Sequence, residues 1–422
     1  MHSRVALLAL TSLVVVLLPS CTDQLDPAAP TDSPLEPSPA IRQGTANDPN
    51  TLARGVPGFG GFFLDAQGVP TVYLKDAGQR GNAERALQPY LSGKRLAAGQ
   101  LKVRRGDYDW TDLERWYSAA SAELLSLPGG VYVDADEASN RVRIGVERGA
   151  GSRIRGELAR LKLPESAVIV EETEPVRFAV APKPKPGQQS LQSVVRPIVG
   201  GVQINFPGFL CTLGFNARVG QNGASSFITN SHCTNTQGGV QNTPYWQPTQ
   251  SASPSQIATE AADPQYLASL SGCPSGRVCR FSDASRAAYQ SNFSQFTTGR
   301  IAKTNRPGRS LTITGAFTIT SEGAAIVGNV VNKVGRTTGW SQGNVTNTCV
   351  NTNVSGTNIT QLCQNFVSAT VGSGDSGSPV FIIGSGNNVA LVGILWGGSG
   401  SNNFVFSPLS QIEQELGGLT TF

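Results

Sequence analysis

The chain contains very little histidine and little charge. Only two of its 422 residues are histidines, His2 and His232, and charged residues make up 15% of the total. The net charge is +4 and the basic residues form no cluster, so the usual signature of a nucleic-acid-binding protein is missing. A charge content this low is typical of secreted, β-rich proteins.

The first residues form the pattern of a secretory signal. Arg4 precedes a mostly apolar run over 5–18, which is shorter than the roughly 20 residues that a membrane-spanning helix needs. We therefore expect residues 1–20 to be a signal peptide and the protein to be extracytoplasmic. Removal of this segment takes His2 away and leaves His232 as the one imidazole of the mature chain.

Cys21 directly follows this segment. The stretch Leu18-Pro19-Ser20-Cys21 resembles a bacterial lipobox, in which the cysteine is lipidated and anchors the protein to a membrane. Lipidation of Cys21 fits the cysteine count, because it leaves an even number for the rest of the chain. Ordinary secretion, with an unpaired thiol at Cys21, is the alternative.

The other six cysteines all lie in the second half of the chain: Cys211, Cys233, Cys273, Cys279, Cys349 and Cys363. An even set behind a signal peptide predicts disulfides in an oxidising compartment. Spacing alone leaves the connectivity open, and sequential pairing, 211–233, 273–279 and 349–363, is the simplest scheme. The paired C-x₂₋₄-C clusters of structural zinc sites are missing, so we expect no metal, and no other cofactor.

Two proline-containing segments divide the remaining chain. Residues 21–55 are rich in Pro, Asp, Ser and Thr and lack apolar periodicity, so we expect a flexible tether. A second linker begins at Pro182-Lys183-Pro184 and extends over 182–197. Two folded regions, 56–181 and 198–422, follow from these breaks.

Region 56–181 alternates short strands with helices, which predicts a small α+β domain. Segments 61–74 and 130–146 predict hairpins, and helices are expected near 82–91 and 153–161. The pattern indicates a weak internal duplication of a hairpin plus a helix. Region 198–422 instead alternates short apolar runs with Gly, Asn and Ser, and helical periodicity is scarce before 408–416. This predicts an all-β sandwich or barrel.

The segment 374–379, Gly-Asp-Ser-Gly-Ser-Pro, indicates that Ser376 is a nucleophile. A serine hydroxyl needs a base to take its proton, and His232 is the available base. No histidine follows Ser376, which excludes the chain order of an α/β-hydrolase. No Asp or Glu lies between 198 and 231, which excludes the subtilisin order. The order that remains is histidine, acid, serine.

Four acidic residues lie between His232 and Gly374, namely Glu260, Asp263, Asp283 and Glu322. Asp283 has small and apolar neighbours, as a buried carboxylate that orients an imidazole requires. Asp263 precedes a proline, which predicts an exposed turn. Asp283 is therefore the preferred acid.

With this order, region 198–422 resembles the chymotrypsin/trypsin family, in the style of secreted bacterial members such as streptogrisins and alpha-lytic protease. The specific motifs are Ser231-His232-Cys233 and the segment 374–379. The resemblance implies two antiparallel β-barrels with the site between them. It implies that Ser376 attacks the carbonyl, that His232 acts as general base and then acid, and that Asp283 orients the imidazole. The backbone N–H groups of Gly374 and Ser376 would form the oxyanion hole.

The resemblance also implies supporting residues. In bacterial relatives an internal arginine neutralises the aspartate before the serine, so we expect Arg336 to pair with Asp375; a solvated surface charge is the alternative. The family has a serine just before its substrate-binding strand, where this chain has none. Trp396 takes that place, and we expect its indole to donate to Asp283.

The same resemblance gives the substrate-binding positions, which are Thr370, Trp396, Gly397, Gly398 and Phe404. Thr370 takes the place of the aspartate that selects basic side chains in trypsin, and no acidic residue lies between Glu322 and Asp375. Specificity for Lys or Arg is therefore not expected. Phe404 narrows the pocket, which favours small or medium apolar side chains.

The main hypothesis is a secreted or lipid-anchored serine endopeptidase that acts on polypeptides. Region 56–181 would then be a pro-domain that assists folding and inhibits the enzyme. A protease fold without activity, with 56–181 as a permanent sensor or adhesion domain, is the alternative from another class. An esterase with the same triad is the third hypothesis, since acyl transfer to water is shared chemistry.

Overall fold

The computed structural model describes residues 48–93, 98–179, 190–220, 223–305 and 309–422. The expected signal peptide, Cys21, most of the tether and the first part of the second linker lie outside these ranges. All described residues belong to one unit, 39–422. Among them, no helix has both the length and the apolar character required to cross a membrane.

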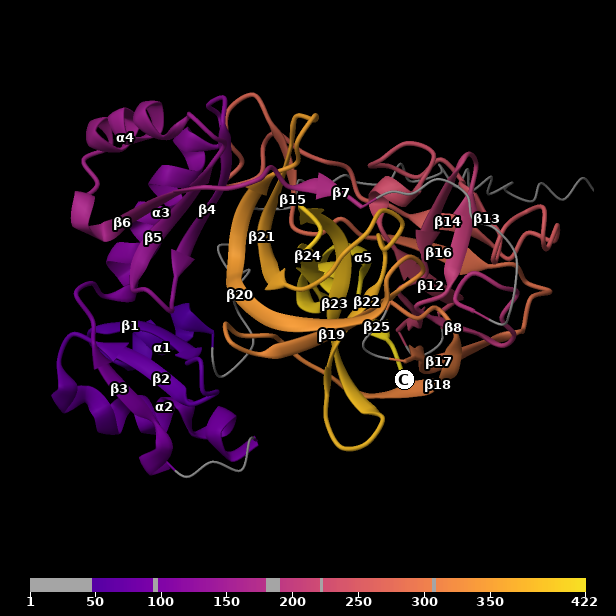
Figure 1. Cartoon of the computed structure of the whole chain (residues 1–422), viewed down its shortest axis with the longest axis horizontal. Helices are drawn as coiled ribbons and strands as arrows, with labels where there is room; N and C mark the ends of the chain where they lie inside the picture. The colour runs from indigo at the N-terminus through magenta and orange to yellow at the C-terminus, as the bar shows by residue number, and fades with distance from the viewer. Residues whose placement is uncertain (1–47, 94–97, 180–189, 221–222, 306–308) are drawn as a thin grey trace, which may run out of the picture. The chain divides into compact units, whose positions relative to one another are not determined.

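The N-terminal region repeats one arrangement twice (Figure 1). In each copy a hairpin is followed by a helix and by a third strand that pairs parallel to the second strand of the hairpin. A parallel pair needs a crossover, and the helix supplies it. The first copy consists of β1 (Phe59–Leu64), β2 (Pro70–Leu74), α2 (Arg80–Gly93) and β3 (Lys102–Arg105). The second consists of β4 (Gly130–Asp136), β5 (Arg141–Val146), α4 (Gly151–Arg160) and β6 (Val168–Glu172).

Helix α3 (Trp110–Leu124) lies between the two copies in the chain. Its first turn is capped by Asp109, whose side chain accepts from the N–H of Asp112. One face of the helix is buried at Leu113, Ala120 and Leu124. Trp116 is only partly buried and packs against this core.

The last residues of the predicted tether 21–55 are folded. Residues Pro49–Gly55 form helix α1, with Asp48 as its N-cap and a proline at its start. Leu52 is buried in the same core as α3. The predicted boundary at 55 therefore falls too late, because the proline-rich composition did not reveal this seven-residue helix.

The C-terminal region is β-rich, as predicted, with one late helix, α5 (Leu409–Leu416), inside the expected 408–416. A six-stranded antiparallel sheet has the order β13-β14-β16-β12-β11-β25. Its strands are β11 (Phe215–Val219), β12 (Ser225–Thr229), β13 (Pro244–Tyr245), β14 (Ala258–Ala262), β16 (Ser285–Tyr289) and β25 (Leu419–Thr420). A separate hairpin joins β9 (Gln203–Phe206) and β10 (Phe209–Thr212).

A larger sheet contains the remaining strands and the second copy of the N-terminal arrangement. Its main path runs β15-β21-β24-β23-β22-β19-β20-β4-β5-β6. Its further strands are β7 (Arg177–Phe178), β8 (Ile198–Gly200), β15 (Val278–Arg280), β17 (Phe296–Thr304), β18 (Ile313–Glu322), β19 (Val330–Gly335), β20 (Gly339–Asn353), β21 (Ile359–Ser368), β22 (Pro379–Ile383), β23 (Asn388–Ser399) and β24 (Asn403–Pro408).

The N-terminal region extends the hairpin β20–β21 by strand addition (Figure 1). β4 pairs antiparallel with β20, with Val133 opposite Asn351. Side chains reinforce the pairing: Asn347 donates to Asp134 at 2.8 Å, and the Tyr117 hydroxyl donates to the carbonyl of Cys349 at 3.2 Å. One continuous sheet therefore joins the two regions, and the N-terminal region covers an edge that β20 would otherwise expose.

The second half of the expected linker 182–197 is packed. Leu191 and Val195 are buried in the core of the C-terminal region, and Ser190 forms a β-bridge with Thr312. The predicted boundary at 197 is therefore wrong by several residues, because the apolar residues after Ser190 find partners that composition does not show.

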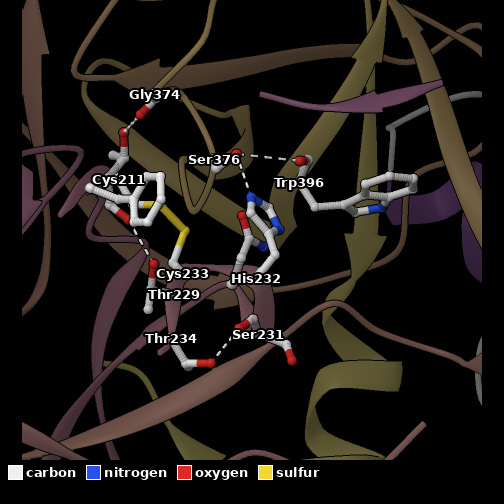
Figure 2. The surroundings of a disulfide bond; sticks show 12 residues. Cys211, Thr229, Ser231, His232, Cys233, Thr234, Gly374, Ser376 and Trp396 are labelled. Atoms are coloured by element: carbon white, nitrogen blue, oxygen red, sulfur yellow. Dashed lines mark hydrogen bonds between the residues drawn. A yellow bond between two sulfur atoms is a disulfide. The ribbon is translucent and has the colours of Figure 1, made fainter. Parts of the chain in front are cut away.

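Three disulfides join Cys211 to Cys233, Cys273 to Cys279 and Cys349 to Cys363. The sequential pairing is confirmed. The first bridge ties β10 to the turn that carries His232 (Figure 2).

Candidate active site

Ser376 and His232 come together from segments that adjoin two different sheets of the C-terminal region. His232 sits in a single 3₁₀ turn, Ser231–Cys233, which follows β12. Ser376 lies in the turn before β22. His232 Nε2 is 2.8 Å from Ser376 Oγ (Figure 2), and the serine is fully buried. This distance is that of a hydrogen bond, so the imidazole can take the hydroxyl proton.

Asp283 holds the other side of the imidazole. Its Oδ2 is hydrogen-bonded to His232 Nδ1, and its Oδ1 accepts the backbone N–H of His232 at 3.2 Å. Burial alone would raise the pKa of Asp283, but the neighbouring His232 and further hydrogen-bond donors outweigh burial and lower the pKa. The carboxylate is therefore ionised and fixes the ring with Nε2 toward the serine.

Tyr266 supplies a hydroxyl that the sequence did not lead us to expect. The phenol donates to Asp283 Oδ1 at 3.0 Å and accepts the amides of Gln237 at 2.8 Å and Gln361 at 3.0 Å. Two donors directed at the phenol oxygen leave its own proton for the carboxylate. Burial and the Asp283 charge raise the pKa of Tyr266, so the phenol keeps that proton.

We expect Tyr266→Phe to lower kcat by about tenfold or more and to leave KM nearly unchanged, because it removes one hydrogen bond to a charged, buried carboxylate. Steady-state hydrolysis of a peptide substrate measures both constants. Tyr289→Phe is the matched control, since that buried phenol donates to Asn216 at 2.7 Å, away from the triad. A kcat within twofold of the unmodified enzyme would show that Tyr266 does not position Asp283.

Trp396 does not take the role expected of it. Its indole N–H donates to Gln364 Oε1 at 2.8 Å and not to Asp283. The same amide oxygen accepts the hydroxyl of Ser407, which in turn accepts the backbone N–H of Asp283 at 3.0 Å. The Trp396 carbonyl instead accepts the Ser376 hydroxyl at 3.3 Å, and the indole ring contacts Phe178 (Figure 2 shows the first contact).

Asp263 is buried, contrary to the expected exposed turn, and is only 4% exposed. It accepts from Ser231 Oγ at 2.9 Å and from the Arg280 guanidinium at 2.8 Å. Arg280 also pairs with Glu415 at 2.9 Å. Asp263 thus fixes the residue before His232, whereas the choice of Asp283 as the carboxylate on the imidazole agrees with the geometry.

Asp375 is paired with Lys333, not with Arg336. Lys333 Nζ lies 2.9 Å from Asp375 Oδ2 and both side chains are fully buried. The Arg336 guanidinium instead donates to Gln203 and to Thr337. Burial raises the pKa of Asp375, but the Lys333 ammonium and hydrogen bonds from Thr338 outweigh it, so the pKa is lowered. A buried cation does pair with Asp375, but this cation is Lys333 of β19 and not Arg336.

Gly374 and Ser376 direct two backbone N–H groups at one point. Both donate to the carbonyl oxygen of Ala179, the distance from the Ser376 nitrogen being 3.5 Å. Gly374 has φ of +98°, a left-handed conformation that favours glycine. The Thr212 hydroxyl donates to the Gly374 carbonyl at 2.8 Å and fixes this orientation. The two donors form a site for an oxygen that carries negative charge.

Residues 176–179, here called the strap, lie in the site as an extended segment. Arg177 and Phe178 form β7, which pairs antiparallel with β23 opposite Gly398 and Gly397. Phe178 stacks on the His232 ring, with 4.1 Å between centroids. A Cβ on Gly397 would lie 2.6 Å from the Arg177 carbonyl, so only glycine admits the strap there. The strap thus lies along β23 as an added antiparallel strand.

The other predicted substrate positions surround the strap, with one exception. Gly397 and Gly398 pair with it, and Phe404 belongs to the same buried cluster as Ala179. Thr370 does not line the pocket of about 270 Å³ that opens beside the strap, whereas its neighbour Val371 does. The residues that the C-terminal region contributes to this pocket are uncharged: Val371, Gly372, Ser373, Gly398 and Gly400.

One group of metal-ligating atoms lies near the triad, formed by Cys211, His232 and Cys233. The two sulfurs are bonded to each other as a disulfide, so they do not present the thiolates that bind a metal. His232 already contacts Asp283 and Ser376 through its two nitrogens.

Solved structures of bacterial serine proteases match about half of this chain. Thermobifida fusca Protease A is 23% identical, with 53% of this chain and 99% of that chain covered and a TM-score of 0.39. A Nocardiopsis protease is 21% identical, with 51% and 95% covered and a TM-score of 0.38. A Cellulomonas bogoriensis chymotrypsin is 23% identical, with 53% and 98% covered and a TM-score of 0.38. No protein-family model and no curated protein sequence matches the chain.

Proposed function

We propose that the chain is an extracytoplasmic serine endopeptidase, with Ser376 as nucleophile and a chymotrypsin-like double β-barrel over 198–422. The observation that carries the proposal is the convergence of two groups on one carbonyl position. His232 Nε2 contacts Ser376 Oγ at 2.8 Å, and the N–H groups of Gly374 and Ser376 both donate to the Ala179 oxygen. Three disulfides support an oxidising, extracytoplasmic location.

In the proposed reaction Ser376 Oγ attacks the carbonyl carbon of the scissile bond while His232 Nε2 takes its proton. The carbonyl oxygen becomes an oxyanion that accepts the two N–H groups. The C–N bond then breaks, the leaving amine receives the proton from His232, and an acyl-enzyme remains on Ser376. Water attacks the acyl carbon by the same route and releases a carboxylate and free Ser376.

A fluorophosphonate probe tests this proposal, because it reacts only with an activated serine. The full chain is expressed, processed material is incubated with the probe, and peptide mapping locates the adduct on Ser376. The His232→Gln variant should not be labelled, because glutamine is polar and of similar size to histidine but cannot act as a base. A labelled His232 variant, or an adduct at another serine, would contradict the assignment.

We propose further that region 56–179 inhibits the enzyme and assists its folding. The strap fills the site, and the rest of the region holds the strap in place through the pairing of β4 with β20. A β-rich domain with many long-range pairings folds slowly, and the added sheet stabilises the hairpin β20–β21. If fluorophosphonate labels nothing in processed protein, the permanently inactive sensor becomes the better hypothesis.

The position of the Ala179 carbonyl predicts self-cleavage between Ala179 and Val180. N-terminal sequencing of the C-terminal fragment of processed protein should start at Val180, before the Pro-Lys linker. The Ser376→Ala chain should stay uncut under the same conditions. Cleavage of that variant at the same bond would show that another protease does the processing, and a fragment starting elsewhere would contradict the register of the strap.

A further inference from the structure

The strap carries information about which peptides the site accepts. P1 denotes the peptide residue whose carbonyl enters the oxyanion hole, and P2, P3 and P4 are the residues that precede it in turn toward the N-terminus. We infer that the site selects peptides with an aromatic residue at P2, a small residue at P1 and an apolar residue at P4, and is indifferent at P3. The inference rests on the proposed function and specifies its substrate class.

The P2 position is occupied by Phe178 between two rings. Its centroid lies 4.1 Å from the His232 ring, at an interplanar angle of 27°, and 5.8 Å from the Trp396 ring, at 67°. These are a stacked and an edge-on arrangement, both favourable for aromatic pairs. Trp396 is itself fully buried and tied to Gln364, so the ring face is preformed. A glycine at P2 would lose both ring contacts and leave the imidazole face to water.

The P1 position takes only a small side chain. Ala179 is 7% exposed and belongs to one apolar cluster with Val371 and Phe404. A Cβ on Gly398, which lines this position, would lie 2.8 Å from Val371 Cγ1. The valine therefore fills the space beneath Gly398 that a long P1 side chain would need.

The P4 and P3 side chains differ in burial. At P4, Val176 is 1% exposed and packs in a cluster with Trp396 and Val405. At P3, Arg177 is exposed and contributes its backbone to the pairing with Gly398. Val176 and Phe178 are two residues apart, so they share one side of the extended segment and both pack in the cluster that contains Trp396, whereas Arg177 points to the other side.

The test uses enzyme purified from the processed full chain and fluorogenic tetrapeptide amides, with kcat/KM as the readout. The parent peptide is Val-Arg-Phe-Ala. Glycine at P2 should lower kcat/KM by about tenfold or more, and phenylalanine at P1 should lower it by about a hundredfold. Alanine at P3 is the matched control and should change it by less than about threefold. Equal rates with phenylalanine and glycine at P2 would overturn the inference.

Val371→Ala provides a second measurement on the enzyme side. It removes two methyl groups from beneath Gly398, so the penalty for phenylalanine at P1 should shrink by about tenfold, while the P2 preference should persist. An unchanged P1 profile would refute the role of Val371. Fluorophosphonate labelling distinguishes failure of the inference from failure of the proposed function. A labelled enzyme without these preferences refutes the inference alone. An unlabelled, inactive protein refutes the proposed function and the inference with it.

Discussion

Ser376→Ala is expected to lower kcat for peptide hydrolysis by about a millionfold, and His232→Ala by a similar factor. Each residue is inert without the other, because the hydroxyl needs the base and the base has no other proton to take. The double variant should therefore be no slower than either single one. Residual turnover above the uncatalysed rate would come from the oxyanion hole of Gly374 and Ser376, whose backbone both variants retain.

The matched control for this prediction is Ser385→Ala. Ser385 lies in the turn between β22 and β23, where its side chain is exposed and its carbonyl accepts the N–H of Asn388. Its kcat should stay within about twofold, since surface changes away from bonded groups have small effects. If the double variant lost much more than either single variant, the two residues would act independently and the triad would be wrong.

The triad could be predicted because scarcity left few choices. Only one histidine follows the signal segment, and the nucleophile motif around Ser376 is specific. The acid was harder, since Asp263 and Asp283 both turn out to be buried. The prediction selected Asp283 from its apolar neighbours, and the reason given against Asp263 was wrong even though the choice agrees with the geometry.

The residues that the sequence missed act across the fold. Tyr266 reaches Asp283 from a long loop after β14, and nothing in its local sequence marks it. Lys333 lies in an apolar strand, Val-Val-Asn-Lys-Val-Gly over 330–335, where a lysine is unusual. That anomaly was a usable signal, because a charge buried in a strand needs a partner of opposite sign.

The strap is a second feature that could not be predicted from the sequence. Residues 176–179 were assigned to the end of the N-terminal region, and no local pattern distinguishes them from an ordinary connection. Their function depends on β23, more than 200 residues later, which offers glycines at the two places where the strap passes. Pairings of such sequence separation are set by the tertiary fold and not by propensity.

Lys333→Met is expected to destabilise the folded state by about 3–5 kcal/mol, because it leaves the Asp375 carboxylate buried without its cation. The turn that carries Gly374 is held by that carboxylate, which accepts the N–H groups of Thr337 at 3.0 Å and Thr338 at 3.1 Å. Loosening it should misplace one oxyanion donor and lower kcat by about a hundredfold. Urea unfolding and steady-state kinetics measure the two effects.

Two further variants test whether the lost stability comes from the unpaired charge of Asp375. Arg336→Gln removes a nearby buried cation that does not contact Asp375, so it should cost only about 2 kcal/mol, the value of two hydrogen bonds. Combining Lys333→Met with Asp375→Asn removes the unpaired charge and should recover part of the stability. Equal losses in the Lys333 and Arg336 variants would contradict the assignment of Lys333 as the partner.

The pH dependence of stability tests whether the charge on Asp375 causes this loss. The lowered pKa of Asp375 contributes stability above about pH 4, the unfolded value, and this contribution is lost as pH falls through the folded pKa. Without Lys333, burial dominates and raises that pKa, so deprotonation now costs stability as pH rises through it. The difference in unfolding free energy between the unmodified protein and Lys333→Met should therefore be largest near neutral pH and shrink toward about pH 3. A difference that stays constant from neutral pH to about pH 3 would show that the lost energy comes from packing of the lysine stem and not from the charge on Asp375.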